Sequence, residues 1–242
     1  GVSHSAYKPQ ITSDGTGGAI VTWSDHRSIS LNIYAQRVDS SGSPAWTPNG
    51  VELRGNGVTG SAYYEQITSD GTGGAIVTWQ DYRGGQGDIY AQRIDSGGNP
   101  QWTANGVELR GAGVTDDANN PQITGDGAGG AIVSWEDWRS GRPGVYAQRV
   151  SRNAPTISGI APSSGTKDGM VDVADLSGTG FFSPDYGSVP IQPMVKLKRA
   201  GEADIEATNV SVVSPTRITC SCDLTGAAVG AWDVYVQNPD GQ

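Results

Sequence analysis

Short stretches in which apolar and polar residues alternate make up much of this chain, and their spacing is that of extended strands. In "NIYAQRVD", Ile33 and Ala35 fall on one side of a strand. Tyr34 and Gln36 fall on the other side. The run "AIVTW" from Ala19 is β-branched and aromatic, which is typical of a buried strand, and helical periodicity is missing from this part of the sequence. The pattern predicts an all-β protein.

The same pattern returns three times at a constant offset of 56 residues. "SDGTGGAIVTW" stands at Ser13 and again at Ser69, and "GDGAGGAIVSW" follows at Gly125. Each copy continues into "YAQR", and the first two copies end in "NGVELRG". Because no insertion breaks the register, these segments are true repeats.

One repeat predicts four antiparallel strands, namely "PQITSD", "AIVTWSD", "NIYAQRVD" and "GVELRG". Four such strands in 56 residues are typical of one blade of a β-propeller. We expect blades over about residues 1–56, 57–112 and 113–152, the third without its "NGVELRG" strand. An open arc of three blades would expose sheet edges and its inner apolar faces. We therefore expect further repeats upstream in a longer protein, or copies that associate to complete a ring.

The segments "VDSSGSPAW" and "IDSGGNPQW" loosely resemble the Asp-box hairpin of sialidase-like propellers, in which an acid, a glycine and a tryptophan follow at short spacing. Here the spacing is one residue longer on each side of the glycine. More broadly, residues 1 to about 150 resemble the repeats of secreted bacterial β-propeller proteins. This resemblance implies an extracellular or cell-surface location.

After residue 152 the pattern changes, and residues 153–242 resemble an IPT/TIG domain, an immunoglobulin-like β-sandwich. "WDVYVQN" and "MVDVADL" alternate at period two, and the chain ends in "NPDGQ". The resemblance rests on Pro155, Ile157, Ile160, Pro162, Ser164, Gly165, Val171, Val173, Gly178, Gly180 and Phe181. Such domains usually have one more strand after the final turn, so we expect this sandwich to lack its last strand.

Charge and composition narrow the function classes. The net charge is −9 and no basic patch is evident, which disfavours nucleic-acid binding. No run of 18 apolar residues predicts a membrane span. The two cysteines, Cys220 and Cys222, share one side of a strand. Structural thiols, a strained or intermolecular disulfide, and a metal site stay open as interpretations, with the first favoured.

A Trp-x-Asp-x-Arg triplet closes the second strand of every repeat, and two interpretations compete for it. The triplets could bind a sugar, with the tryptophan stacking and the acid and base donating and accepting hydrogen bonds. Alternatively, the aspartate caps a turn, the arginine pairs with it, and the tryptophan packs between blades; recurrence in each repeat favours this architecture. The residues are Trp23, Asp25 and Arg27; Trp79, Asp81 and Arg83; and Trp135, Asp137 and Arg139.

Asp14, Asp70 and Asp126 precede glycine in the first turn of each repeat and are weak calcium candidates. A single carboxylate supplies too few of the oxygens that calcium needs, whereas a hairpin turn favours Asp-Gly. We therefore predict turns, with calcium as the alternative and no other cofactor.

Residues that differ between the copies are better candidates for ligand contact. Tyr82 and Trp138 occupy the position of His26, and Tyr63 and Tyr64 likewise vary in context between the units. A glycosidase would need a non-repeated carboxylate pair, and no nucleophile motif accompanies His4 or His26, so an enzyme is disfavoured.

The sequence predicts a non-enzymatic structural, adhesive or assembly module of the cell exterior, with protein subunits or surface glycans as partners. Subunits could join into a fibre by donating a strand across a sheet edge. The alternatives are a carbohydrate-binding propeller with one aromatic site per blade, and a fragment of a sialidase-like glycosidase.

Overall fold

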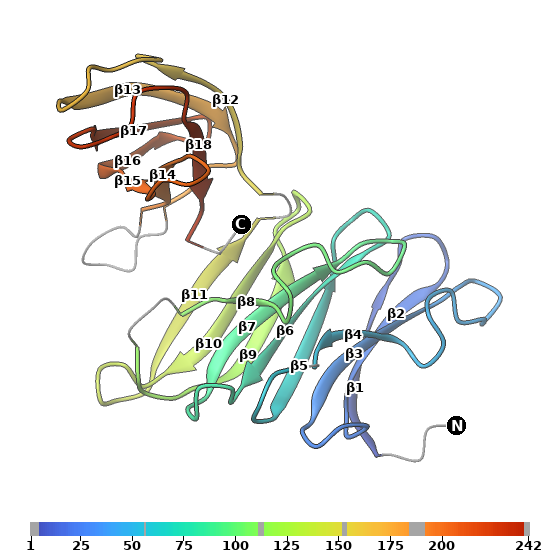
Figure 1. Cartoon of the computed structure of the whole chain (residues 1–242). Coiled ribbons are helices and arrows are strands. Elements are labelled where there is room, and N and C mark those ends of the chain that lie inside the picture. The colour runs from blue at the N-terminus through green and yellow to red at the C-terminus, as the bar shows by residue number, and fades with distance from the viewer. Residues whose placement is uncertain (1–4, 56, 111–113, 152–153, 184–191, 240–242) are drawn as a thin grey trace. The chain divides into compact units, whose positions relative to one another are not determined.

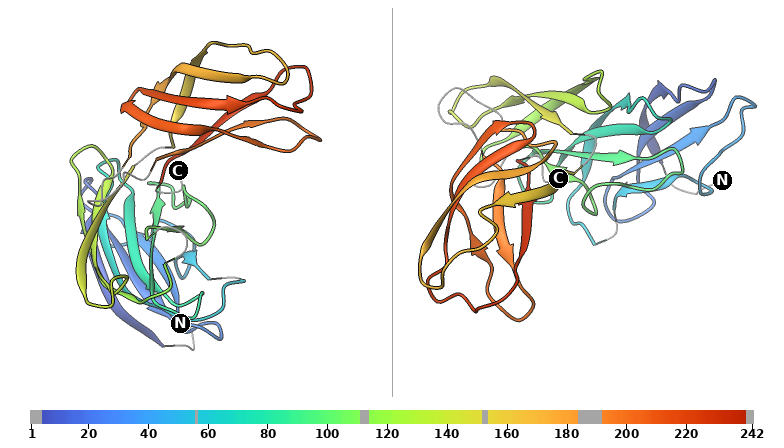
Figure 2. Two further views of the ribbon diagram at one scale, coloured as in Figure 1. Left: turned by 90° about the vertical axis from the view of Figure 1, so that its left-hand side faces the viewer. Right: turned by 90° about the horizontal axis from the view of Figure 1, so that it is seen from above.

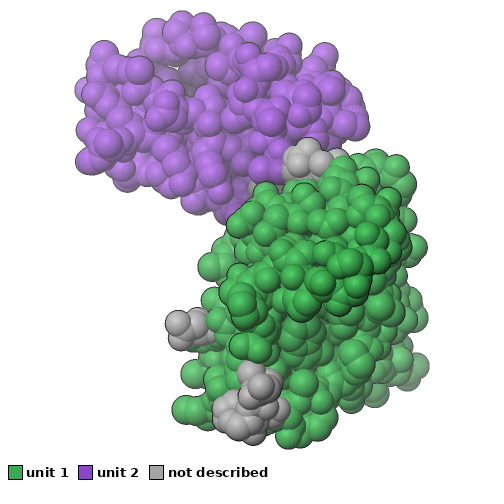
Figure 3. Space-filling view, turned by 90° about the vertical axis from the view of Figure 1, so that its right-hand side faces the viewer, with its two compact units in different colours: residues 1–152 green, residues 153–242 purple. Residues whose placement is uncertain are grey.

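A computed structural model describes residues 5–55, 57–110, 114–151, 154–183 and 192–239. All regular structure within these ranges is β-strand, as the alternating pattern predicts (Figure 1). The chain divides into two compact units, residues 1–152 and 153–242, which Figure 3 distinguishes by colour. Each unit is described by itself.

The first unit consists of three antiparallel sheets, one for each repeat. In every sheet the strands follow their order along the chain, so that each sheet is a simple meander. The first sheet contains β1 (Ala6–Ser13), β2 (Ala19–Asp25), β3 (Asn32–Val38) and β4 (Val51–Arg54). The second contains β5 (Ala62–Ser69), β6 (Ala75–Asp81), β7 (Asp88–Ile94) and β8 (Val107–Glu108). The third contains β9 (Ala118–Gly125), β10 (Ala131–Asp137) and β11 (Gly144–Val150).

The repeated sheets confirm the prediction of four-stranded, blade-like units. Within the described residues the third sheet has three strands and ends at β11, in agreement with the missing "NGVELRG" segment. Trp79 lies directly opposite Tyr90 in the β6–β7 pairing, and the first and third sheets repeat this register. The Asp-Gly turn before β6 places Gly71 and Gly73 at positive φ, where glycine carries no steric cost.

Apolar side chains from adjacent sheets pack against each other, so the core of this unit lies between the sheets. At the first junction Ile20, Ile33 and Leu53 belong to one buried cluster with Val77 and Trp79. The second junction repeats this cluster 56 residues further on, as Ile76, Ile89, Leu109, Val133 and Trp135. The β1, β5 and β9 strands lie side by side along the stack (Figure 1).

The last sheet exposes the face that its two predecessors bury. Ile132 is 43% exposed and Val145 is 83% exposed, whereas the corresponding Ile76 and Ile89 have no exposed surface. At the other end of the stack, Ile11 of the first sheet is 68% exposed. Apolar side chains are therefore exposed on the first and third sheets of the stack.

The second unit has two sheets around one core (Figure 2). One sheet has the order β12–β13–β17–β16 and the other β15–β14–β18. The bounds are β12 Thr156–Ala161, β13 Met170–Thr179, β14 Met194–Lys198, β15 Ile205–Glu206, β16 Thr208–Ser214, β17 Arg217–Asp223 and β18 Asp233–Gln237. Cys220 and Cys222 are free thiols buried in this core. Residues 240–242 lie outside the described ranges, so the expected absence of a last strand is not tested.

Candidate functional site

The Trp-x-Asp-x-Arg triplet of the second sheet closes on its own aspartate. Trp79 Nε1 donates to Asp81 Oδ2 over 2.8 Å, and Arg83 Nη2 donates to the same oxygen over 2.7 Å. The Arg83 backbone N–H donates to the other oxygen, Oδ1, over 2.9 Å. The period-two spacing brings these groups together, because alternate residues of a strand lie on the same side. The carboxylate is consequently shared between an indole and a guanidinium of its own strand end.

The arginine of each triplet stacks on the tyrosine of "YAQR". The Arg83 guanidinium carbon lies 3.8 Å from the centre of the Tyr90 ring, and Tyr90 in turn stacks with Trp79 at 6.4 Å between ring centres. Arg83 Nη2 also donates to the Asn105 carbonyl oxygen over 2.7 Å. The other two sheets repeat the stack as Arg27 on Tyr34 and Arg139 on Tyr146.

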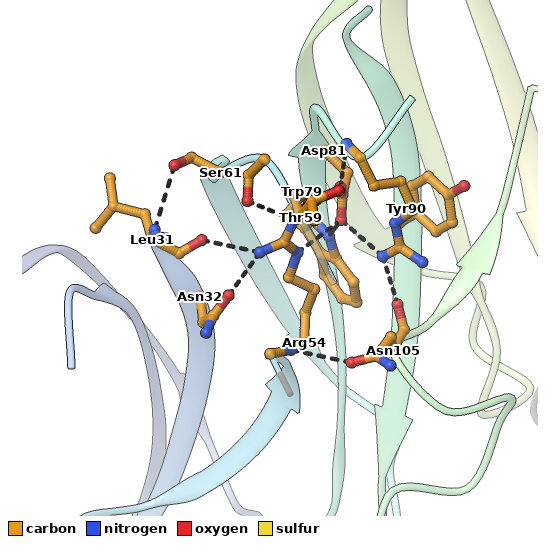
Figure 4. Close-up of polar contacts among 12 residues, drawn as sticks. Leu31, Asn32, Arg54, Thr59, Ser61, Trp79, Asp81, Tyr90 and Asn105 are labelled. Carbon is orange, nitrogen blue, oxygen red and sulfur yellow. Dashed lines mark hydrogen bonds and ion pairs between the residues drawn. The ribbon is translucent and has the colours of Figure 1, made fainter. Parts of the chain in front are cut away.

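A second arginine reaches the same aspartate from the preceding sheet (Figure 4). Arg54 follows Leu53 at the end of β4, and its Nε donates to Asp81 Oδ2 over 3.1 Å. Its Nη2 donates to Asp81 Oδ1 over 3.2 Å, and its Nη1 donates to Asn32 Oδ1 over 2.5 Å. Arg54 Nη2 also donates to the Thr59 carbonyl oxygen. Arg54 and Asp81 have no exposed side-chain surface, and these hydrogen bonds offset the cost of burying both charges.

The second junction repeats this arrangement, in which an arginine of one sheet binds the triplet aspartate of the next sheet, and which we term the arginine clamp. Arg110 Nε donates to Asp137 Oδ2 over 3.0 Å, and Arg110 also pairs with Asp88. Burial alone would raise the pKa of Asp137, but hydrogen bonds from Arg139 and Arg110 outweigh it and lower the pKa well below its usual range. Asp25 of the first sheet accepts from Trp23 and Arg27 of its own triplet.

These contacts favour the architectural interpretation of the triplets. Trp79 and Trp135 are buried, Trp23 is half-buried, and all three aspartates are buried. The polar groups that a sugar would have to contact therefore already bind one another between and within sheets. Arg54 and Arg110 were missed by the sequence reasoning, although a charged residue repeated beside Leu53 and Leu109 in a buried strand was the available signal.

The Asp-Gly turns are held by a different aspartate–arginine pair. Asp14 accepts hydrogen bonds from the backbone N–H groups of Thr16 and Gly18, at 2.8 Å each, and from Arg37 Nε at 2.9 Å. The Thr16 backbone N–H is the main reason why the pKa of Asp14 is lowered. Arg37 is the arginine of "YAQR", and the other sheets pair Arg93 with Asp70 and Arg149 with Asp126. A calcium ion would have to displace these donors, so the contacts favour turns.

Three tyrosines come together in one place, and the first sheet carries Tyr7, Lys8 and His26 at the equivalent positions. Tyr63, Tyr64 and Tyr82, with Ser61, line an open hollow at the β5 end of the second sheet. Trp138 is 41% exposed at the position of Tyr82 in the third sheet, where Asn119 and Asn120 replace the other two tyrosines.

The remaining candidates add little chemistry. His26 lies in an exposed turn, with Nδ1 3.3 Å from the Ser28 carbonyl oxygen, and His4 lies outside the described residues. Among the described residues no three His, Cys, Asp or Glu side chains gather as metal ligands would. Nor does any helix in the described ranges have the length and apolarity to cross a membrane.

Comparison with known proteins finds no family model that matches this chain and no curated protein that is similar to it. The chain is thus defined by its architecture: an all-β protein of repeated, small antiparallel sheets, followed by a two-sheet unit.

Proposed function

We propose that this chain is a non-enzymatic structural and assembly module, which associates with further blades of its own repeat at the cell exterior. The observation that carries the proposal is the apolar end face of the third sheet. Ile132 and Val145 are exposed there, at positions that are fully buried in the two preceding sheets. The extracellular location rests on the resemblance of the repeats to those of secreted propeller proteins.

The repeat identifies the occupant that fits this face. Ile76 and Ile89 belong to a buried cluster with Ala131, Val133 and Trp135 of the next sheet. The corresponding residues at the free end of the first sheet are Ala19, Val21 and Trp23, all partly exposed. In each internal junction, the face that contains Ile76 and Ile89, or their equivalents, packs against such a surface of the next sheet. The first sheet of a second copy of the chain therefore offers the matching surface for the exposed face of the third sheet.

Such a joint would be weaker than the internal ones. The third sheet ends at β11 within the described residues, so it has no strand equivalent to β4, which carries Arg54. The joint therefore gains apolar burial without the arginine clamp. β11 is the edge strand of its sheet among the described residues, and an incoming extended strand would pair with it as β4 pairs with β3. A contact between unlike faces generates a ring if its rotation closes and a filament if it does not.

Sedimentation velocity over a concentration series tests the proposal. We expect reversible association of the intact chain, and we expect Ile132→Asp and Val145→Asp to weaken it. Both side chains are exposed, so these changes should leave the fold intact. Ile29→Asp is the matched control, because Ile29 is 99% exposed in the β2–β3 loop. A chain that stays monomeric throughout, or association that both aspartate variants leave unchanged, would contradict the proposal.

A further inference from the structure

The hollow between Ser61, Tyr63, Tyr64 and Tyr82 is an aromatic surface that the fold itself does not explain. Tyr63 meets the edge of Tyr82 at 5.9 Å between ring centres and lies 6.3 Å from Tyr64. Tyr64 is 44% exposed, and the hollow has a volume of about 400 Å³. Large aromatic side chains normally bury their rings, so a group of three around an open hollow indicates a contact surface.

The repeat supplies an internal comparison. The third sheet forms the same strand with the same irregularity in register, yet carries Asn119 and Asn120 where the second sheet carries Tyr63 and Tyr64. Asparagine is therefore sufficient for the architecture at both positions.

Tyr64 is also a poor choice for its backbone conformation. Its φ is 56°, and the equivalent Asn120 has a φ of 55°. Asparagine adopts this left-handed conformation readily, whereas a bulky aromatic residue does so rarely. Tyr64 carries this steric cost and yet stays 44% exposed, which favours a role in contact with a ligand.

Hydrogen-bonding groups surround the rings. Tyr82 Oη accepts a hydrogen bond from Gln80 Nε2 over 2.9 Å, so its own hydrogen is free to donate. Ser61 Oγ accepts from the Leu31 backbone N–H and can likewise donate. Lys8, from the first sheet, places its ammonium 3.8 Å from the centre of the Tyr64 ring. The site thus joins apolar ring faces to donors, and it spans two adjacent sheets of one unit.

We propose that Tyr63, Tyr64 and Tyr82, with Lys8 and Ser61, form one carbohydrate-binding site at the junction of the first two sheets. A sugar ring presents both an apolar face of C–H groups, which stacks on an aromatic ring, and hydroxyl groups that pair with the donors. Lys8 already covers a face of Tyr64 and repels a second cation, which disfavours a quaternary ammonium ligand. A hollow lined by four residues is also short for an extended proline-rich peptide.

A glycan array of neutral and acidic saccharides, probed with the intact chain and followed by calorimetric titration of the bound glycan, tests this site. We expect Tyr63→Asn and Tyr64→Asn to weaken binding by about tenfold or more, through loss of stacking. Both substitutions copy the third sheet, so they should fold, and Tyr64→Asn should not lower the thermal midpoint. Trp138→Ala is the control, and we expect this variant to bind the glycan as tightly as the parent chain.

The absence of binding to every arrayed glycan, or binding that both asparagine variants retain, would overturn the site. So would binding of choline or of a polyproline peptide that the same variants abolish. Self-association is measured separately by sedimentation, so failure of the sugar site leaves the assembly proposal unaffected.

Discussion

Arg54 and Asp81 form a fully buried ion pair between two sheets, with Arg54 Nε 3.1 Å from Asp81 Oδ2. Replacing Arg54 by methionine leaves Asp81 buried with fewer partners. We expect a loss of about 3–5 kcal/mol in the free energy of unfolding, measured by urea denaturation followed by tryptophan fluorescence. Arg149→Met is the control: the Arg149 side chain is 48% exposed, and Asp126 keeps its hydrogen bonds from the Ala128 and Gly130 backbone N–H groups, so the loss should cost about 0.2–1 kcal/mol. Equal losses of unfolding free energy in the two variants would contradict a stabilising role of the buried Arg54–Asp81 pair.

Glu65 is a buried carboxylate where the other two sheets have Pro9 and Pro121. Its Oε1 accepts from the Ser24 backbone N–H over 2.9 Å, and burial raises its pKa. A raised pKa in the folded state means that stability is lost as the pH rises through that pKa. We therefore expect Glu65→Gln to be increasingly more stable than the parent chain as the pH rises above about 4.3, the unfolded pKa.

Urea unfolding of both proteins at several pH values checks this difference. The control for the substitution itself is Glu136→Gln, which changes an exposed carboxylate on β10. A Glu65→Gln advantage that is the same at pH 4 and pH 8 would count against the assignment.

Gly106 lies against the indole of Trp79 and has a φ of +86°. A Cβ built there would be 2.6 Å from Trp79 Cη2, so alanine must displace a buried ring. We expect Gly106→Ala to cost about 1–3 kcal/mol from overpacking, beyond the backbone strain. Gly71→Ala isolates the strain, because Gly71 has a φ of +73° with nothing within 4 Å of its Cβ position. Equal free energies of unfolding of the two variants, measured by urea denaturation, would show that the Trp79 ring moves without cost.

Acid should destabilise the first unit before the second. The pKa values of Asp70, Asp81 and Asp137 are lowered in the folded state: burial opposes the shift, but hydrogen bonds from arginines and backbone groups outweigh it. A lowered pKa contributes stability above the unfolded pKa of about 3.9, and this stability is lost as the pH falls through the folded-state pKa. In the second unit, hydrogen bonds from the Thr225 side chain and backbone lower the pKa of Asp223, which is exposed and pairs with no arginine among the described residues.

Two probes separate the units during an acid titration. Trp232 is the only one of the seven tryptophans in the second unit, so fluorescence mainly reports the first unit. Cys220 and Cys222 are buried in the second unit, so their reaction with an acid-active thiol reagent such as a pyridyl disulfide reports its opening. As the pH is lowered, we expect the fluorescence to change at a higher pH than the pH at which the thiols begin to react. Thiol exposure that precedes it would contradict the prediction.

Strand positions and repeat boundaries followed from the sequence, since alternation, Asp-Gly turns and a constant 56-residue offset are local properties of the chain. The grouping of Trp79, Asp81 and Arg83 was also predictable, because alternate residues of a strand share a side. The IPT/TIG resemblance is different in kind: no family model matches, and the structure supports the coarser description of a two-sheet, all-β unit.

Tertiary structure decided which groups meet across sheets. Arg54 reaches Asp81 and Lys8 reaches Tyr64 because neighbouring sheets stack at a particular offset. That offset depends on how the apolar faces interlock, and the period of a single strand carries no information about it. The sequence therefore determined the repeating unit and pointed to the tyrosines where the copies differ. Only the packing of one sheet on the next revealed which aspartates are clamped and which ring faces stay open.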